Sequence, residues 1–267
     1  MVARGATGVA DSRPDPVLAS ARAMVFVDDP AAPVPDRADA HHLLDVLRLR
    51  PGELVVASDG IGSWVPCRVS GGRAGRGSPD PATVLVVDGG VVTVPRPETE
   101  VTVAFVPAKG DRPDWVVQKL TELGVDRIVP IRSRRSVVRW EGDRAERAVD
   151  RLRRVAREAS AQCRRAWLPE VSDLSTLEAI TGRIGVPPIL AHPGGGPPSL
   201  ARPVIAVGPE GGWDDEELAV APGTVGLGPT VLRAETAAVA AGTVLCALRN
   251  GLVRTLAQPR SVSKTTT

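Results

Sequence analysis

The segment VIAVGPEGGWDDEE, residues 204–217, joins an apolar run to an acid-rich run through a glycine turn. Residues 204–207 predict a buried strand, and Asp214 with Glu217 has the spacing of a capping box at the start of a helix. Open α/β sheets bind their ligands at such strand-to-helix turns. The acids at the helix start would repel a polyphosphate, so we expect a neutral or cationic ligand. A tight turn that binds nothing is the alternative interpretation.

A second segment of this kind, LGPTVLRAET at residues 227–236, again leads from a strand into a helix. Two such loops predict one crevice at the edge of a sheet. Arg233 and Glu235 lie at or just before the helix start. A surface salt bridge, or an acid that compensates the helix dipole, is the simpler explanation of each.

Around these two segments, most of the chain alternates between strand and helix patterns. Short apolar runs bounded by turns predict strands, and apolar residues with a period of 3.6 predict helices. Such alternation is typical of an α/β fold with a parallel sheet covered on both faces. The predicted strands are residues 101–106, 127–131, 189–191, 204–207 and 224–227, and the predicted helices are residues 113–123, 143–165, 214–220 and 234–249.

The N-terminal third has a different pattern. Short β-type runs separated by glycine-rich turns, at residues 54–57, 64–69 and 83–87, predict a small and mostly β domain with one helix at residues 41–49. Pro95-Arg96-Pro97 predicts a stiff hinge. We therefore expect a disordered leader (1–23), a β domain (24–97), an α/β domain (98–256) and a disordered tail (257–267).

Positive charge is concentrated in the middle of the chain. Residues 107–170 hold 16 basic and 10 acidic residues, whereas the whole chain has a net charge of only +2. Paired arginines concentrate enough charge to suit a phosphate backbone, although a solvated basic helix is the simpler interpretation. The predicted RNA contacts are Arg134, Arg135, Arg153, Arg154, Arg164 and Arg165, with Arg48 and Arg50 as additions.

The cysteine and histidine content favours neither a disulfide framework nor a metal site. The three cysteines are far apart and include no CxxC pair, and the three histidines lack ligand spacing with them. The chain has no run of 18 apolar residues and no apolar secretory segment near its N-terminus. We expect a cytoplasmic protein without a metal or a membrane anchor.

Taken together, several motifs resemble a known family, the bacterial methyltransferases that modify N3 of a uridine in 16S ribosomal RNA of the small subunit. The resemblance spans about residues 24–250. Its motifs are His42 with VLR at 46–48, QKLTELG at 118–124, QCRR at 162–165, LAHP at 190–193, GPEGG at 208–212 and LGPTVLRAET at 227–236.

The resemblance implies a PUA-like β-barrel for RNA, a SPOUT domain with a C-terminal trefoil knot, a homodimer, and S-adenosylmethionine (SAM) as the methyl donor. A cationic sulfonium suits a crevice beside an acid-rich helix start. The residues carried over as cofactor-binding are Leu190, His192, Gly208, Glu210, Gly211, Gly212, Leu227, Gly228, Leu232 and Thr236.

Three residues are candidates for catalysis on the implied reaction. Arg233 would stabilise the negative charge that spreads onto the uracil oxygens. Glu122 or Glu235 would accept the N3 proton. An ion pair with Lys119 is the simplest explanation of Glu122, because the two are three residues apart on one predicted helix.

Two other functions fit the same motifs. One is a related knotted methyltransferase that acts on another RNA or another atom. The other is an RNA-binding ribosome assembly factor that has lost catalysis, which the intact glycine loops argue against.

Overall fold

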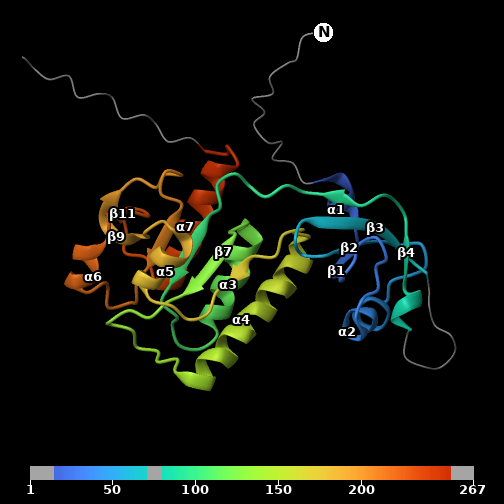
Figure 1. Cartoon of the computed structure of the whole chain (residues 1–267), viewed down its shortest axis with the longest axis horizontal. Helices are drawn as coiled ribbons and strands as arrows, with labels where there is room; N and C mark the ends of the chain where they lie inside the picture. Colours follow the sequence, from blue (N-terminus) through green and yellow to red (C-terminus); the bar gives the residue numbers. More distant parts are fainter. Residues whose placement is uncertain (1–14, 71–79, 254–267) are drawn as a thin grey trace, which may run out of the picture.

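The computed structural model describes residues 15–70 and 80–253. Figure 1 shows two parts: a small β-rich part at one end, and a larger part at the other in which helices cover a sheet. Each part has its own sheet and its own apolar core. The candidate site lies in the larger part.

The smaller sheet has the order β1-β2-β3-β4, with β5 also paired to β3. β1 and β2 are parallel, and the other pairs are antiparallel. Val55 and Ala57 face the core of this part, whereas Val56 between them faces a second cluster. The elements are β1 (Ala23–Phe26), α2 (Arg37–His41), the π-helical turn η1 (His42–Val46), β2 (Leu54–Ser58), β3 (Ser63–Val69), the 3-10 turn η2 (Pro81–Thr83), β4 (Leu85–Val87) and β5 (Val92–Thr93).

The larger sheet has six parallel strands in the order β11-β9-β10-β6-β7-β8. Every residue of the central strands β6 and β10 is buried, as expected for a parallel sheet covered on both faces. The predicted parallel α/β sheet is therefore confirmed. Its strands are β6 (Thr102–Phe105), β7 (Arg127–Pro130), β8 (Glu170–Val171), β9 (Ile189–Gly196), β10 (Val204–Val207) and β11 (Thr224–Val225).

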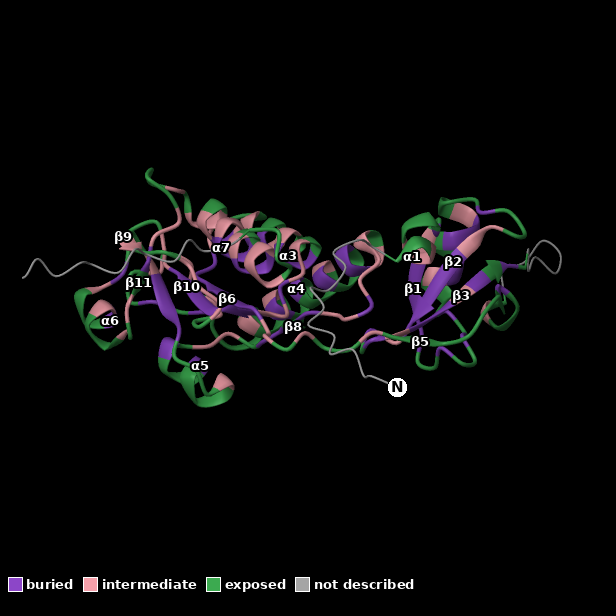
Figure 2. Cartoon of the chain, turned by 90° about the horizontal axis from the view of Figure 1, so that it is seen from above, coloured by how far each residue is buried: buried purple, intermediate pink, exposed green. Residues whose placement is uncertain are grey.

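Helices cover both faces of this sheet (Figure 2). α3 (Arg112–Leu123), α4 (Gly142–Cys163) and α7 (Ala234–Arg249) pack on one face, and α5 (Leu177–Ile184) and α6 (Asp215–Val220) on the other. Within the described residues, no helix has both the length and the apolar character needed to cross a bilayer.

Three local predictions differ from the structure. The helix predicted for residues 41–49 is instead α2 followed by a π-helical turn, and Arg48 after it has a left-handed backbone with φ 53°. The helix predicted to reach Arg165 ends at Cys163, because Arg164 is also left-handed. Of the strand predicted for residues 224–227, only the first two residues form a strand, and the other two belong to a loop.

The predicted leader extends too far into the chain. Residues 15–23 are ordered: Pro16–Ser20 forms the short helix α1, and β1 begins at Ala23. The Asp15 carboxylate accepts hydrogen bonds from the first free N–H groups of α1, and Val17 and Leu18 pack against a buried cluster. Residues 1–14 and the predicted tail at 257–267 lie outside the described residues.

Side chains join the two parts. The Trp167 indole donates a hydrogen bond to the Val94 carbonyl at 2.8 Å, and the Arg96 guanidinium lies 4.4 Å from its ring centroid. Gly62 lies so close to this ring that a Cβ there would be 2.4 Å from it. The joint is therefore a packed contact in addition to a covalent connection.

Asp126 forms a buried ionic centre at the end of the larger part nearest this joint. Its carboxylate accepts from the Val101 amide at 2.8 Å and from Arg165 at 3.1 Å, and it also pairs with Arg249. The two arginines come from the ends of α4 and α7, and each side chain is mostly buried. One carboxylate therefore connects the residue before β6 to the ends of α4 and α7.

Candidate functional site

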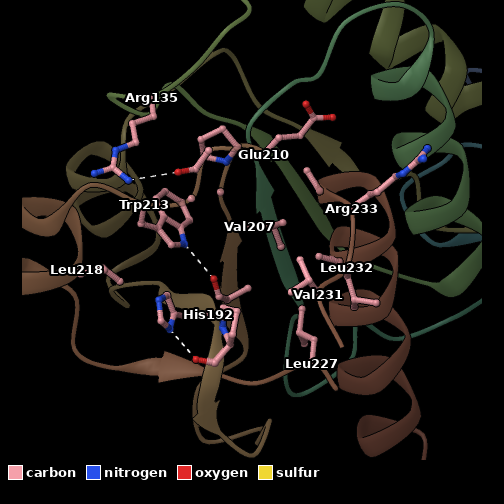
Figure 3. Close-up of a pocket in the computed structure, with 18 of the residues that line it drawn as sticks. Arg135, His192, Val207, Glu210, Trp213, Leu218, Leu227, Val231, Leu232 and Arg233 are labelled. Atoms are coloured by element: carbon pink, nitrogen blue, oxygen red, sulfur yellow. Dashed lines mark hydrogen bonds between the residues drawn. The ribbon is translucent and has the colours of Figure 1, made fainter. Parts of the chain in front are cut away.

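A cavity of about 770 Å³ lies at the carboxyl ends of β9, β10 and β11. Figure 3 shows Arg135, Trp213 and His192 on one side of it and Leu227, Val231 and Leu232 on the other. The three strands are parallel, so the loops that follow them meet at one edge of the sheet. The volume lies within the roughly 300–1,000 Å³ typical of small-molecule sites.

The first wall is the loop after β10. The Gly212 amide donates to the Pro209 carbonyl at 2.9 Å, and Gly212 has φ 73°, which favours glycine. Trp213 is buried beneath this loop, and its indole N–H donates to the Ala191 carbonyl at 3.0 Å (Figure 3). A Cβ on Gly208 would lie 2.9 Å from that ring. The glycine is therefore required for the tryptophan to hold the loop.

The carboxylate of Glu217 also fixes the loop after β10. The predicted capping box between Asp214 and Glu217 is present. Glu217 is buried and also accepts from the Ser133 hydroxyl at 3.2 Å and from the Arg134 amide at 3.1 Å. These donors satisfy the buried carboxylate, and they link the loop after β10 to the loop after β7.

Charged groups surround the glycine turn. Glu210 and Asp215 line the cavity, so a positive ligand would meet two carboxylates. Arg135 also lines it and donates to the Gly211 carbonyl at 3.2 Å (Figure 3). Arg134 pairs with Glu216 at 2.6 Å. Of these two arginines, both predicted as RNA contacts, Arg135 lines the cavity and Arg134 is paired next to it.

The second wall is the loop between β11 and α7, which is mostly apolar. Leu227 and Leu232 line the cavity, and Val231 is 89% exposed. Gly228 has φ 149°, a value that favours glycine. Arg233 precedes the first residue of α7, and its guanidinium has no hydrogen-bond or ion-pair partner among the described residues. Arg233 thus borders the cavity with unused donors, and Figure 3 shows its guanidinium turned away from Leu232 toward the neighbouring helix.

The structure brings eight of the ten predicted cofactor residues together and leaves two outside. Leu190 is fully buried in the core behind the sheet edge, and its neighbour Ala191 lines the cavity in its place. Thr236 is one turn further along α7, on a face that the cavity does not reach. The residues that line the cavity are His192, Gly208, Glu210, Gly211, Gly212, Leu227, Gly228 and Leu232.

The two predicted proton acceptors do not line this cavity. Glu122 is on α3, where it pairs with Lys119 at 2.8 Å and borders a different cavity, near Cys163. Glu235 is in the first turn of α7, and its Oε1 lies 3.9 Å from Nε of Arg112. Its Oε2 is buried without a hydrogen-bond partner among the described residues. The geometry therefore supports a role for Glu235 toward Arg112 and not toward a ligand in this cavity.

The other predicted RNA contacts differ in how free their side chains are. The structure contradicts the prediction that Arg165 contacts RNA. Its guanidinium bonds Asp126 and the Thr121 and Val125 carbonyls inside the protein. Burial lowers the pKa of this guanidinium, and Asp126 opposes the shift.

Two of the remaining arginines on α4 and its end are also occupied. Arg153 bonds Asp150 at 3.0 Å and Asp173 at 2.7 Å, and Arg164 donates to the Ala19 carbonyl at 3.3 Å. Arg48, Arg50 and Arg154 are exposed, and their guanidinium groups have no such partner in the part of the chain that the structure describes.

The motifs did not reveal three residues of this region: Trp213, Lys109 and Arg112. Arg112 begins α3, far from the glycine loops in sequence, yet it pairs with Glu210 at 2.7 Å. The tryptophan lay inside the quoted segment, so its position directly after the glycines was the available signal. Nothing local marks the other two. No group of three or more metal-binding side chains occurs among the described residues.

A parallel α/β sheet with a cavity between two glycine loops at its carboxyl edge is the architecture of an α/β protein that binds a small ligand. Two family models match: an RNA methyltransferase domain over residues 95–246 and an RNA methyltransferase PUA domain over residues 34–74. The chain belongs to this RNA methyltransferase family.

Individual relatives agree. The chain is 33% identical over 231 residues to ribosomal RNA small subunit methyltransferase E of Mycobacterium bovis, covering 80% of this chain and 86% of the relative. It superposes on a probable rRNA-methyltransferase from Porphyromonas gingivalis with a TM-score of 0.69 at 26% identity, covering 86% and 100% of the two chains. It also superposes on the Neisseria gonorrhoeae methyltransferase E bound to S-adenosyl methionine, with a TM-score of 0.68 at 26% identity and coverage of 85% and 97%.

Proposed function

We propose that this protein transfers a methyl group from SAM to N3 of a uridine in 16S ribosomal RNA. The observation that carries the proposal is the cavity between the two glycine loops, in a chain whose relatives are named small-subunit rRNA methyltransferases. A neighbour of the same fold is described with bound SAM.

The residues around the cavity fit this cofactor. Apolar side chains of the second loop suit a flat base, and the open turn at Gly211 exposes backbone groups for hydrogen bonds. Glu210 and Asp215 suit a positive sulfonium. SAM, when bound, supplies an electrophilic methyl on that sulfonium.

The protein's part in the reaction is to align, to balance charge and to receive a proton. N3 of the uracil loses its proton and forms the new N–C bond as the C–S bond breaks, and the sulfur keeps the bonding electrons. Holding nucleophile and methyl in line contributes much of the acceleration. Arg233 donates to a uracil oxygen on which negative charge develops. Glu210 lines the cavity; its Oε1 stays paired with Arg112, and its Oε2, which has no partner among the described residues, accepts the N3 proton.

We include in the proposal the finer features that the family resemblance implies. These are a PUA-like barrel in the smaller part, a trefoil knot, a homodimer, a cytoplasmic location and no metal. One observation supports the knot: β11 lies at one edge of the sheet, whereas α7 after it packs on β6 and α3 in the middle. The chain therefore recrosses the sheet after β11.

The direct test is chemical. Small subunits from cells that lack this protein are incubated with the purified chain and SAM, and the 16S rRNA is digested to nucleosides for mass spectrometry. We expect N3-methyluridine. Methyl on ribose or on C5 would overturn the reaction, and no methyl with any rRNA would favour a binding-only protein.

Gly211→Val is expected to weaken SAM binding at least tenfold without unfolding the protein. A Cβ at this position would meet only the Arg135 Cβ, at 3.9 Å, so the protein has room but the ligand loses space. Calorimetry measures the affinity. The matched control is Gly90→Val, an exposed glycine with nothing within 4 Å of its Cβ, which should bind normally. Equal affinity for the two variants would remove the loop from the cofactor site.

Replacing Arg48 and Arg154 together with alanine is expected to weaken RNA binding and flatten its salt dependence. Each lost phosphate contact reduces the slope of log K against log salt by about 0.7 to 0.9. Filter binding at salt concentrations from about 50 to about 200 mM measures this slope. Arg153→Ala is the control, because its guanidinium is already held by Asp150 and Asp173. An unchanged slope in the double variant would make these arginines a solvated surface.

A further inference from the structure

A second, smaller cavity of about 170 Å³ adjoins the first. Its walls come from the loop after β6, the start of α3, the loops after β7 and β10, and the start of α7. Pro209, Glu210 and Ala234 line both cavities, so the two cavities are direct neighbours. The smaller cavity lies below the roughly 300 Å³ at which sites for cofactor-sized ligands begin, so it suits one ring-sized group.

Arg112 is fixed within this second cavity by two carboxylates. Its Nη1 donates to Glu210 at 2.7 Å, and its Nε lies 3.9 Å from Glu235. No hydrogen bond or ion pair of the other terminal nitrogen, Nη2, is present among the described residues. A guanidinium has five N–H donors in one plane, so Arg112 can keep its carboxylates and still donate to a ligand.

Lys109 is the second cation on this wall. It is exposed, and within the described residues no carboxylate lies within ion-pair distance of it. The lining also includes the apolar side chains of Val137, Val138 and Pro107, which can contact a ring. The cavity therefore combines apolar side chains with cationic donors, and a planar ring that carries acceptor oxygens is the complementary chemistry.

We propose that this smaller cavity receives the target uracil and that Lys109 and Arg112 donate to one of its carbonyl oxygens. This inference rests on the proposed function. Uracil N3 is flanked by two carbonyl oxygens, and the negative charge left by the N3 proton spreads onto both. Arg233 serves one oxygen from the larger cavity, and the Lys109–Arg112 pair serves the other. Donors already in place for developing charge are the usual source of rate enhancement.

Glu235 is a positioning residue in this arrangement. It lines neither cavity and acts through Arg112, whose Nε it faces. The carboxylates that face Arg112 are Glu210 and Glu235, and they hold its charge at the wall between the two cavities.

The test uses the full chain with small subunits that lack the modification. Lys109→Met and Arg112→Met are each expected to slow single-turnover methyl transfer, at saturating SAM and RNA, by about tenfold to a hundredfold, somewhat less than the loss of a principal donor. SAM affinity by calorimetry and RNA affinity by filter binding should change less than threefold. Arg112→Lys, which keeps the charge, should recover part of the rate. The control is Arg183→Met. Arg183 is an exposed arginine on α5 that pairs with Glu170.

The pH dependence separates a base contact from a structural role. A nearby cation lowers the pKa at which bound uracil loses its N3 proton, so removing it should move the rise of the rate toward higher pH by about one unit. An unmoved profile with an unchanged rate would overturn the inference. A loss confined to RNA affinity and its salt slope would assign the two cations to a phosphate instead. If the wild type gives no N3-methyluridine, the proposed function itself fails.

Discussion

Arg233→Ala is expected to slow methyl transfer by about a hundredfold to a thousandfold, the usual cost of losing one preorganised donor to developing negative charge. Arg233 lines the cavity directly before α7, and its guanidinium has no partner among the described residues. Figure 3 places it and Glu210 toward the same end of the cavity. The donors are therefore available to a substrate without first breaking a bond within the protein.

Single-turnover rates at saturating SAM and RNA measure this effect, with SAM affinity and thermal stability measured on the same preparations. We expect affinity within about threefold of the wild type and an unchanged melting temperature, because the Arg233 side chain bonds no other residue in the part of the chain that the structure describes. Arg183→Ala again serves as the matched control. A variant that melts earlier, binds SAM less well and yet turns over normally once saturated would show that Arg233 is structural.

Asp126→Ala is expected to lower the free energy of unfolding by about 3–5 kcal/mol, the typical cost of breaking a buried ion pair by removing one partner. The substitution leaves the guanidinium groups of Arg165 and Arg249 buried without their carboxylate, and the Val101 amide without its acceptor. Chemical denaturation followed by circular dichroism measures the change.

The control for this prediction is Asp173→Ala. Asp173 pairs with Arg153 at 2.7 Å but is largely exposed, and exposed pairs contribute about 0–1 kcal/mol. Similar losses for the two variants would mean that the buried centre is not special. Asp126→Asn keeps an oxygen for Val101 and should fall between the wild type and alanine.

Local patterns in the sequence predicted most elements of the larger part because each strand and helix follows its own period, but they did not predict β8 or α5. The glycine loops were found for the same reason: a turn between an apolar run and a capped helix is a local signal. The sequence does not show which residue of a strand end turns outward: the Leu190 side chain lies in the core, and Ala191 next to it lines the cavity.

The partners of charged residues were not predictable in the same way. Arg112 and Glu210 are 98 positions apart, and Arg165 and Asp126 are 39 apart. Along the sequence, Arg165 is one more arginine in a basic run, and only the packing of the end of α4 against the turn before β7 buries it. The strand order, which places β10 between β9 and β6, follows from the same long-range packing.

The packed joint around Trp167 has a consequence for how a target is chosen. The ring fills the space above Gly62 and bonds Val94, so the β-rich part and the cavity keep a set spacing. On the proposed function, an RNA bound by the β-rich part enters the cavity at a constant distance from that part. A uridine is then selected by its distance from a folded landmark in the RNA, and its neighbours in sequence matter less than its position in space.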